Sequence, residues 1–262
     1  MRRIALILAV VAAVAAVPAS ASAALVTAIQ KAGATVSPNK AGTKKKPQAV
    51  KLTLKSSFDP AEVTRQIDEG NQFAMTGGTI LLPKEGTENS KRFPGCEPTT
   101  VFRNEKQCPK GSRVGSGKAT GVGLNLVEPV TLTLFNRPGG KGVTVLVVSV
   151  PSAPVELRDI IVVDLKKLGP ADQYGYRLDF SVPTPLLQPV AGVLAAVQSL
   201  DLTIPVQYVK KGKKKYPYVA TTGCAAGSWT GEFTANYTTT LPVDPTQIDS
   251  SQTVKLSVPC RK

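Results

Sequence analysis

The chain has 262 residues and no histidine, and its 32 lysines and arginines against 18 acidic residues give a formal net charge of +14. The absence of histidine excludes Ser-His-Asp and Cys-His catalytic groups and every histidine-ligated metal site. A cationic surplus of this size suits contact with anionic polymers such as cell-wall polymers or acidic glycans, and general solubility explains it as well.

The first residues have the pattern of a secretory signal peptide. Arg2 and Arg3 supply a positive start, residues 4–17 are apolar throughout, and Ala21-Ser22-Ala23 offers the small residues that signal peptidase accepts. The apolar run is shorter than the ~20 residues of a membrane-spanning helix, which disfavours an uncleaved anchor. We therefore expect residues 1–23 to be a Sec signal peptide cleaved near Ala23, and the mature chain to be secreted without a transmembrane segment.

The mature chain divides by composition. Residues 24–47 are polar and rich in lysine, and we expect this N-terminal segment to be only partly ordered. Two consecutive lobes are expected after it, the first at 48–152 and the second at 153–262. A single continuous sandwich is an equal alternative, because no low-complexity linker separates the two halves.

Alternation of apolar and polar residues predicts strands along most of the chain, each with one buried and one solvent-exposed face. The pattern is clear at 50–54, 174–182, 200–208, 229–238 and 254–258. Two further runs, 143–150 and 160–163, are apolar on both faces and are expected to lie centrally, covered from each side.

Helix is expected only in short pieces, at 61–69 and at 189–199. Many short strands separated by turns predict an all-β, antiparallel β-sandwich with little helix. The fold is expected to form one large lobe or two consecutive Ig-like or jelly-roll-like lobes.

The four cysteines are Cys96, Cys108, Cys224 and Cys260. An even number of cysteines in an exported chain indicates disulfides. Three pairings are possible and the sequence does not decide among them, but we favour the sequence neighbours, Cys96 with Cys108 and Cys224 with Cys260. A zinc site is the rival interpretation, and neither a CxxC pair nor a histidine supports it.

Several phrases of the sequence form a set across most of the mature chain. They are Val36-Ser37-Pro38-Asn39-Lys40 followed by Lys44-Lys45-Lys46-Pro47; Ile80-Leu81-Leu82-Pro83-Lys84; Phe93-Pro94-Gly95-Cys96; Cys108-Pro109-Lys110-Gly111-Ser112-Arg113-Val114-Gly115-Ser116-Gly117; Thr222-Gly223-Cys224; and Val258-Pro259-Cys260. Together they resemble a family of uncharacterised secreted proteins of actinobacteria. The resemblance implies a β-rich extracellular fold with locally paired cysteines, and it implies no catalytic residue.

A lysine cluster lies between two strand patterns and is expected at the tip of a hairpin. Its members are Lys210, Lys211, Lys213, Lys214 and Lys215. They are the candidate anion-binding residues, with salt-sensitive affinity, and the alternative is that they keep the tip solvated and block edge-to-edge aggregation. Too few aromatic residues lie beside them for base stacking, so we expect no nucleic acid partner.

Three further features invite a chemical interpretation. The glycine-rich run 111–121 lacks the GxxxxGK[ST] spacing of a phosphate-binding loop, and we expect a strand with closely packed backbones instead. Asp179, Asp201 and Glu232 fall on predicted solvent-exposed faces and are interpreted as surface groups rather than as the paired carboxylates of a glycosidase. Trp229 is expected in the core rather than stacked on a sugar.

These features predict a secreted, non-catalytic β-sandwich protein with a structural or binding role at or beyond the cell envelope, and no cofactor. Two alternatives come from other classes. One is an exported hydrolase that uses carboxylates or a serine. The other is a module that binds anionic cell-envelope polymers through the lysine cluster.

Overall fold

Antiparallel strands make up most of the structure, a computed structural model that describes residues 30–123, 126–240 and 248–262. The expected signal peptide at 1–23 lies outside the described residues. Eleven strands form one sheet. In spatial order they are β1 (Lys31–Ser37), β3 (Lys51–Ser57), β11 (Ala196–Ile204), β6 (Arg113–Gly123), β7 (Leu126–Asn136), β8 (Gly142–Ser149), β9 (Arg158–Lys167), β10 (Tyr176–Ser181), β4 (Gln72–Leu82), β15 (Ser228–Thr240) and β16 (Ile248–Pro259).

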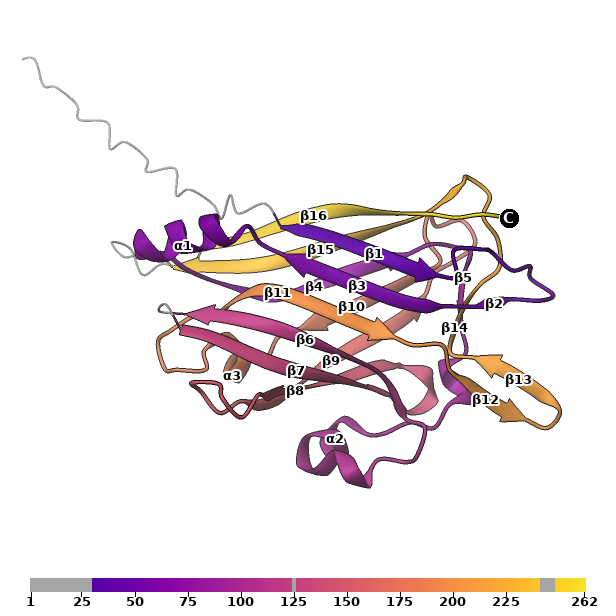
Figure 1. Cartoon of the computed structure of the whole chain (residues 1–262), viewed down its shortest axis with the longest axis horizontal. Helices are drawn as coiled ribbons and strands as arrows, with labels where there is room; N and C mark the ends of the chain where they lie inside the picture. The colour runs from indigo at the N-terminus through magenta and orange to yellow at the C-terminus, as the bar shows by residue number, and fades with distance from the viewer. Residues whose placement is uncertain (1–29, 124–125, 241–247) are drawn as a thin grey trace, which may run out of the picture.

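The sheet curls until its first and last strands, β1 and β16, lie side by side (Figure 1). The backbone amide of Gln30 donates to Oε1 of Gln252 at 3.1 Å, and the amide of Ala41 donates to the carbonyl of Arg261 at 2.7 Å. These bonds join the two edges, although no continuous ladder connects them. The predicted all-β, sandwich-like class with little helix is confirmed, in the form of a nearly closed barrel.

Strands from both predicted lobes contribute to this one sheet. β11 lies between β3 and β6, and β10 pairs with β4, so residues of 153–262 alternate in space with residues of 48–152. Part of the Lys-rich segment forms the edge strand β1, which pairs with β3 over its whole length. The sheet is therefore continuous across the predicted segments.

The smaller elements mark two different ends of the barrel (Figure 1). At the α1 end, α1 (Pro60–Asp68) follows β3 and α3 (Thr184–Leu187) follows β10. The opposite end, which we call the disulfide end, holds most of the others. These are β2 (Gln48–Ala49), β5 (Gly86–Glu88), η1 (Ser90–Arg92), η3 (Pro138–Gly140), β12 (Tyr208–Lys211), β13 (Lys214–Pro217) and β14 (Val219–Thr221). Between the two ends, α2 (Pro98–Asn104) and η2 (Glu105–Gln107) lie against the outer face of β8 and β9.

The two runs that are apolar on both faces, 143–150 and 160–163, form most of β8 and part of β9 near the middle of the sheet. Their inner faces belong to the barrel core. On the outer face, Leu146 packs with Phe135 and with Val101 of α2, so α2 covers this part of the sheet. The prediction that both runs are covered from each side is confirmed.

Two local predictions were wrong and one was right. The expected helix at 61–69 is α1, but the expected helix at 189–199 does not form, because Pro189 and the positive-φ Gly192 interrupt it and Ala196–Ile204 pairs with strands on both sides. The strand predicted over 200–208 ends at Ile204, since Pro205 has no amide proton to donate.

Candidate functional site: an apolar cavity in the barrel

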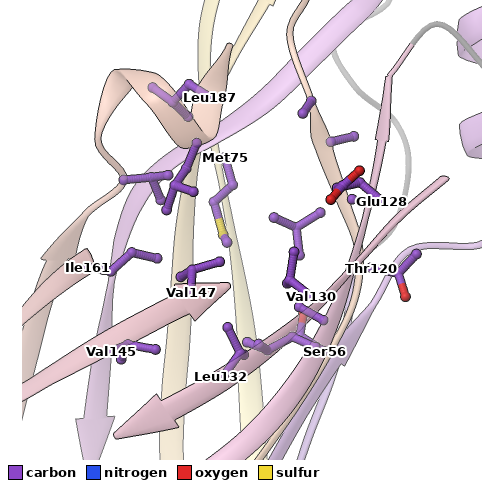
Figure 2. A pocket seen from close by; sticks show the side chains of 18 of the residues that line it. Ser56, Met75, Thr120, Glu128, Val130, Leu132, Val145, Val147, Ile161 and Leu187 are labelled. Carbon is purple, nitrogen blue, oxygen red and sulfur yellow. The ribbon is translucent and has the colours of Figure 1, made fainter. Parts of the chain in front are cut away.

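Side chains do not fill the barrel completely. A cavity of about 280 Å³ lies in its interior, with walls from β-strands on every side (Figure 2). Met75, Val130, Leu132, Val147 and Ile161 are typical of the lining. Apolar cavities of about 150 Å³ already stay dry and take up small apolar molecules, so this volume is sufficient for a ligand.

The cavity follows from strand number and side-chain size. A barrel of about eight strands is just wide enough to be filled by its own side chains, and larger barrels enclose space. Here eleven strands surround the interior. The lining residues of β6 are Ala119, Thr120, Gly121, Val122 and Gly123, three of which have a methyl group or no side chain at all. Sequence reasoning missed the cavity; its signal was this run of small residues on an inward face.

The cavity reaches the surface at the α1 end. Its wall there includes Leu187 of α3 (Figure 2), the following segment, and the beginning of β7. Leu126 and Val190 line the cavity and are nevertheless 48% and 43% exposed, and Val127 beside them is 55% exposed. We call this apolar-rimmed opening the mouth. Large apolar side chains clustered at an opening are typical of a ligand entrance.

The disulfide end is closed. The rings of Phe93 and Tyr218 pack edge to face with centroids 4.9 Å apart. The Tyr218 hydroxyl donates to Oδ1 of Asn136 at 3.1 Å, and Asn136 Nδ2 donates to the carbonyls of Ser90 and Pro94, each at 3.1 Å. Burial raises the pKa of Tyr218 well above its usual range, which keeps the hydroxyl a proton donor. Among the residues that the structure describes, the cavity therefore has one end sealed by polar contacts and one open end.

One buried carboxylate interrupts the apolar wall. Glu128 on β7 is 7% exposed, and its Oε2 accepts a hydrogen bond of 3.1 Å from the amide of Val155. Its Oε1 lies 2.7 Å from the Ser149 hydroxyl. Lys55 is the other charged residue in the described lining, but its side chain is 66% exposed and its ammonium lies 2.9 Å from Asp201. The sequence pattern did not single out Glu128.

The lysine cluster lies at the other end of the molecule. Lys210 and Lys211 end β12 and Lys214 and Lys215 begin β13, so the predicted hairpin is confirmed, with Gly212 at positive φ in its turn. All five lysines are exposed. The cluster faces away from the cavity, and Arg92 stacks 3.9 Å above the ring of Tyr216 at its base.

Other connections at the disulfide end add to this positive charge. They carry Lys40, Lys44, Lys45, Lys46, Lys84, Lys91, Arg92, Lys110, Arg137, Lys141, Arg261 and Lys262, against Glu85, Glu88, Glu97 and Asp172. The described connections at the α1 end (58–71, 150–157 and 182–195) carry Asp59, Glu62, Asp68, Glu69 and Glu156, with Arg65 as their cation. Charge is thus distributed unevenly along the barrel: the closed end is basic, and the described connections around the mouth are acidic.

The three carboxylates considered as a hydrolytic pair do not line the cavity. Asp179 accepts from Arg177 Nε at 2.8 Å and from Thr79 Oγ1 at 2.7 Å, and the Arg177 guanidinium holds the pKa of Asp179 below its ordinary value. Asp201 pairs with Lys55 on β3, and four strands of the sheet separate it from Asp179. Glu232 lies on β15, next to β4. The structure does not bring the three together.

Both disulfides join the cysteines that we favoured from sequence. Cys96 and Cys108 have their Cα atoms 5.3 Å apart, and Cys224 and Cys260 have theirs 5.9 Å apart. Trp229 is buried against the second bridge and donates from Nε1 to the carbonyl of Gly223 at 2.7 Å, so its predicted core position is confirmed. Two disulfides indicate an oxidising, extracellular environment.

The glycine-rich run belongs to β6, as expected. A Cβ at Gly117 would clash with the carbonyl oxygen of Asp201 on the neighbouring strand β11. Glycine therefore allows the two backbones to approach closely, and the run makes no phosphate-binding loop.

No match to this chain was found among protein-family models, curated proteins or solved structures. None of the helices in the described part of the chain is long and apolar enough to cross a membrane. The function is therefore argued from the cavity and from the distribution of charge.

Proposed function

We propose that this chain is a secreted, non-catalytic binding protein that holds an apolar ligand inside its barrel. The observation that carries the proposal is the cavity of about 280 Å³, whose lining is apolar except at a few positions near its edge. Concave, preformed, mostly apolar pockets with few polar groups are the usual form of small-molecule binding sites. The one open end, with its apolar rim, supplies a route for the ligand.

Export is part of the proposal. The signal-peptide pattern at 1–23, the two disulfides and the resemblance to secreted proteins of actinobacteria support it together. A protein that carries an apolar molecule through water outside the cell needs a closed, stable container. The disulfides tie down the closed end and leave the mouth without a covalent constraint.

Direct binding of a fluorescent probe tests the proposal. N-phenyl-1-naphthylamine, a neutral fluorophore that brightens in apolar surroundings, is expected to bind the purified mature protein with saturation. Ala119→Phe and Val147→Phe place a ring into the cavity from two walls and are expected to weaken binding at least about tenfold, the loss of about 1.4 kcal/mol. Lys118→Phe, on the exposed face of the same strand, is the matched control.

The outcome is decisive in either direction. No saturable binding to the wild-type protein, or equal binding by both cavity variants with their folds intact by circular dichroism, contradicts the proposal. Loss of binding in Lys118→Phe as well points to a general disturbance of β6 and not to the cavity.

A second function is supported by the charge distribution. We propose that the disulfide end contacts anionic polymers of the cell envelope, with Lys210, Lys211, Lys213, Lys214 and Lys215 as its most projecting cations. The basic residues of this end lie on several separate connections, which a long flexible polyanion can contact in turn. Such binding weakens with salt because it depends on counterion release.

Two triple variants with equal charge change test this second function. The hairpin variant replaces Lys213, Lys214 and Lys215 by glutamine and removes three charges from the hairpin. The wall variant replaces Lys31, Lys118 and Lys255 by glutamine and removes three charges from exposed positions on the barrel wall. Long-chain polyphosphate is expected to bind the wild type with a steep salt dependence, which the hairpin variant reduces and the wall variant preserves. If both variants lose the same amount of polyphosphate affinity, binding depends on net charge and not on the hairpin. Binding to anionic vesicles but not to polyphosphate contradicts a polymer partner.

A further inference from the structure

A carboxylate in the cavity wall, Glu128, affects which apolar molecules the cavity can bind. Glu128, Val130 and Leu132 are successive inward positions on β7, and β7 begins at the α1 end. Figure 2 shows Glu128 in the same wall as Val130 and Leu132, across the cavity from Leu187 and closer than Leu132 to the end at which Leu187 lies. A chain-like ligand that fills the apolar depth therefore has its polar end at the level of Glu128.

The Glu128 carboxylate has spare capacity to accept hydrogen bonds. The amide of Val155 donates to Oε2 at 3.1 Å. The single proton of the Ser149 hydroxyl has two acceptors within reach, Oε1 of Glu128 at 2.7 Å and the carbonyl of Val155 at 2.8 Å. A carboxylate has about four lone-pair sites, so at least two have no donor among the described residues.

No cation in the described structure compensates Glu128. None of the described ion pairs includes it. The ammonium of Lys55, the other charged residue of the lining, is held outside by Asp201. The connections around the mouth are acidic as well, with Asp59, Glu62 and Glu156 among their residues.

We infer that the cavity selects apolar ligands whose polar end is a hydrogen-bond donor, such as a fatty alcohol, and rejects ligands that end in a carboxylate. This inference rests on the proposed apolar-ligand function and names its ligand class. A hydroxyl donates to a free lone pair of Glu128. A ligand carboxylate has no proton to donate and no cation to meet, and it faces a like charge where water is scarce.

The experiment compares 1-decanol, methyl decanoate and decanoate as competitors of bound N-phenyl-1-naphthylamine at neutral pH. All three share one chain, and only decanol has a donor. For the wild type, we expect decanol to bind at least about tenfold more tightly than decanoate and several-fold more tightly than the ester, since a hydrogen bond to a charged group is worth that much.

Matched variants separate Glu128 from general hydrophobicity, which also favours decanol over decanoate. Glu128→Gln is expected to lower the decanol-to-decanoate affinity ratio at least about fivefold, because an amide neither repels the carboxylate nor accepts as strongly. Glu156→Gln removes a charge from the neighbouring connection without changing the lining, and it is expected to leave the ratio within about twofold.

The failures are distinguishable. If the fluorophore does not bind at all, the apolar-ligand function is wrong and the inference falls with it. If the fluorophore binds but decanoate competes as well as decanol, or the ester as well as decanol, the inference alone is overturned. An unchanged ratio in folded Glu128→Gln also overturns it, and the wild-type comparison of alcohol and ester stands even if that variant does not fold.

Discussion

The hydroxyl of Tyr218 donates a 3.1 Å hydrogen bond to Oδ1 of Asn136, and both side chains are buried at the closed end of the barrel. Tyr218 precedes the short strand β14, and Asn136 ends β7, so this bond ties the small sheet at the disulfide end to the barrel. Asn136 also holds the carbonyls of Ser90 and Pro94. One asparagine thus bonds polar atoms from two separate segments, the one that holds Ser90 and Pro94 and the one that holds Tyr218.

Replacement of Asn136 by alanine is expected to destabilise the protein by at least about 2 kcal/mol, because it removes the hydrogen bonds of the Pro94 carbonyl and of the buried Tyr218 hydroxyl, while the Ser90 carbonyl keeps the Phe93 amide. Chemical denaturation monitored by circular dichroism measures the loss. Asn236→Ala, at an exposed position on β15, is the control and should change stability by less than about 0.5 kcal/mol. Equal midpoints for the two variants would contradict this role of Asn136.

Ligand affinity should depend on chain length up to the capacity of the cavity. Each buried methylene contributes about 0.8 kcal/mol, or roughly fourfold in affinity. The cavity of about 280 Å³ corresponds to roughly nine liquid-water volumes of ~30 Å³. Since a methylene group is about the size of a water molecule, a chain of about that many carbons fills the cavity. We expect the affinity of straight-chain alcohols to rise about fourfold per carbon and to level off near ten carbons. A continued rise through tetradecanol would show that the chain lies on the surface instead.

The disulfides should affect stability without affecting ligand binding. In the chain-entropy model, the bridges with sequence separations of 12 and 36 contribute about 3 and about 4 kcal/mol. Paired Cys→Ser variants of Cys224 and Cys260 are therefore expected to lose more stability than those of Cys96 and Cys108, by thermal or chemical denaturation. Both folded double variants should keep fluorophore affinity within about twofold, since both bridges lie away from the mouth.

Acid should weaken the attachment of the α2 region to β9. Arg158 Nη2 donates to Glu105 Oε2 at 2.7 Å, and this bond holds the pKa of Glu105 below its ordinary value of 4.5. Because the folded-state pKa is lowered, the pair stabilises the fold fully above that ordinary value, and its contribution is lost as pH falls through the lowered pKa.

Glu105→Gln is accordingly expected to lower Tm by about 1–2 °C at about pH 7, since both partners are partly exposed and such a pair contributes roughly 0.5 kcal/mol. At an acid pH below the lowered pKa of Glu105, the variant and the wild type should converge. Glu97→Gln, exposed at the start of α2 with no side-chain cap bond, is the control and should match the wild type at both values. A difference between Glu105→Gln and wild type that persists in acid would exclude the ion pair as its cause.

The alternation of apolar and polar residues was sufficient to predict many of the strands. Alternation around Trp229 placed the tryptophan inside on β15, and the doubly apolar run at 143–150 indicated a central strand. Alternation fails where one residue breaks the ladder, as at Pro205, where the pattern continues but the strand does not. Periodicity indicates which face of a strand is buried, but it does not indicate where a residue such as Pro205 cannot donate a backbone hydrogen bond to the next strand.

The all-β class and the lysine hairpin followed from the sequence alone, because each depends on neighbouring residues or on composition. The cysteine pairing was one of three possibilities until the structure joined Cys96 with Cys108 and Cys224 with Cys260. Only the tertiary structure decided that β1 and β16 meet, that eleven strands surround an unfilled cavity, and that Glu128 lies in its wall. Strand neighbours are chosen by contacts between distant segments, and the width of a barrel depends on all of them at once. The difference in charge between the two ends also depends on the tertiary structure, since the arrangement of the strands decides which connections lie at the same end.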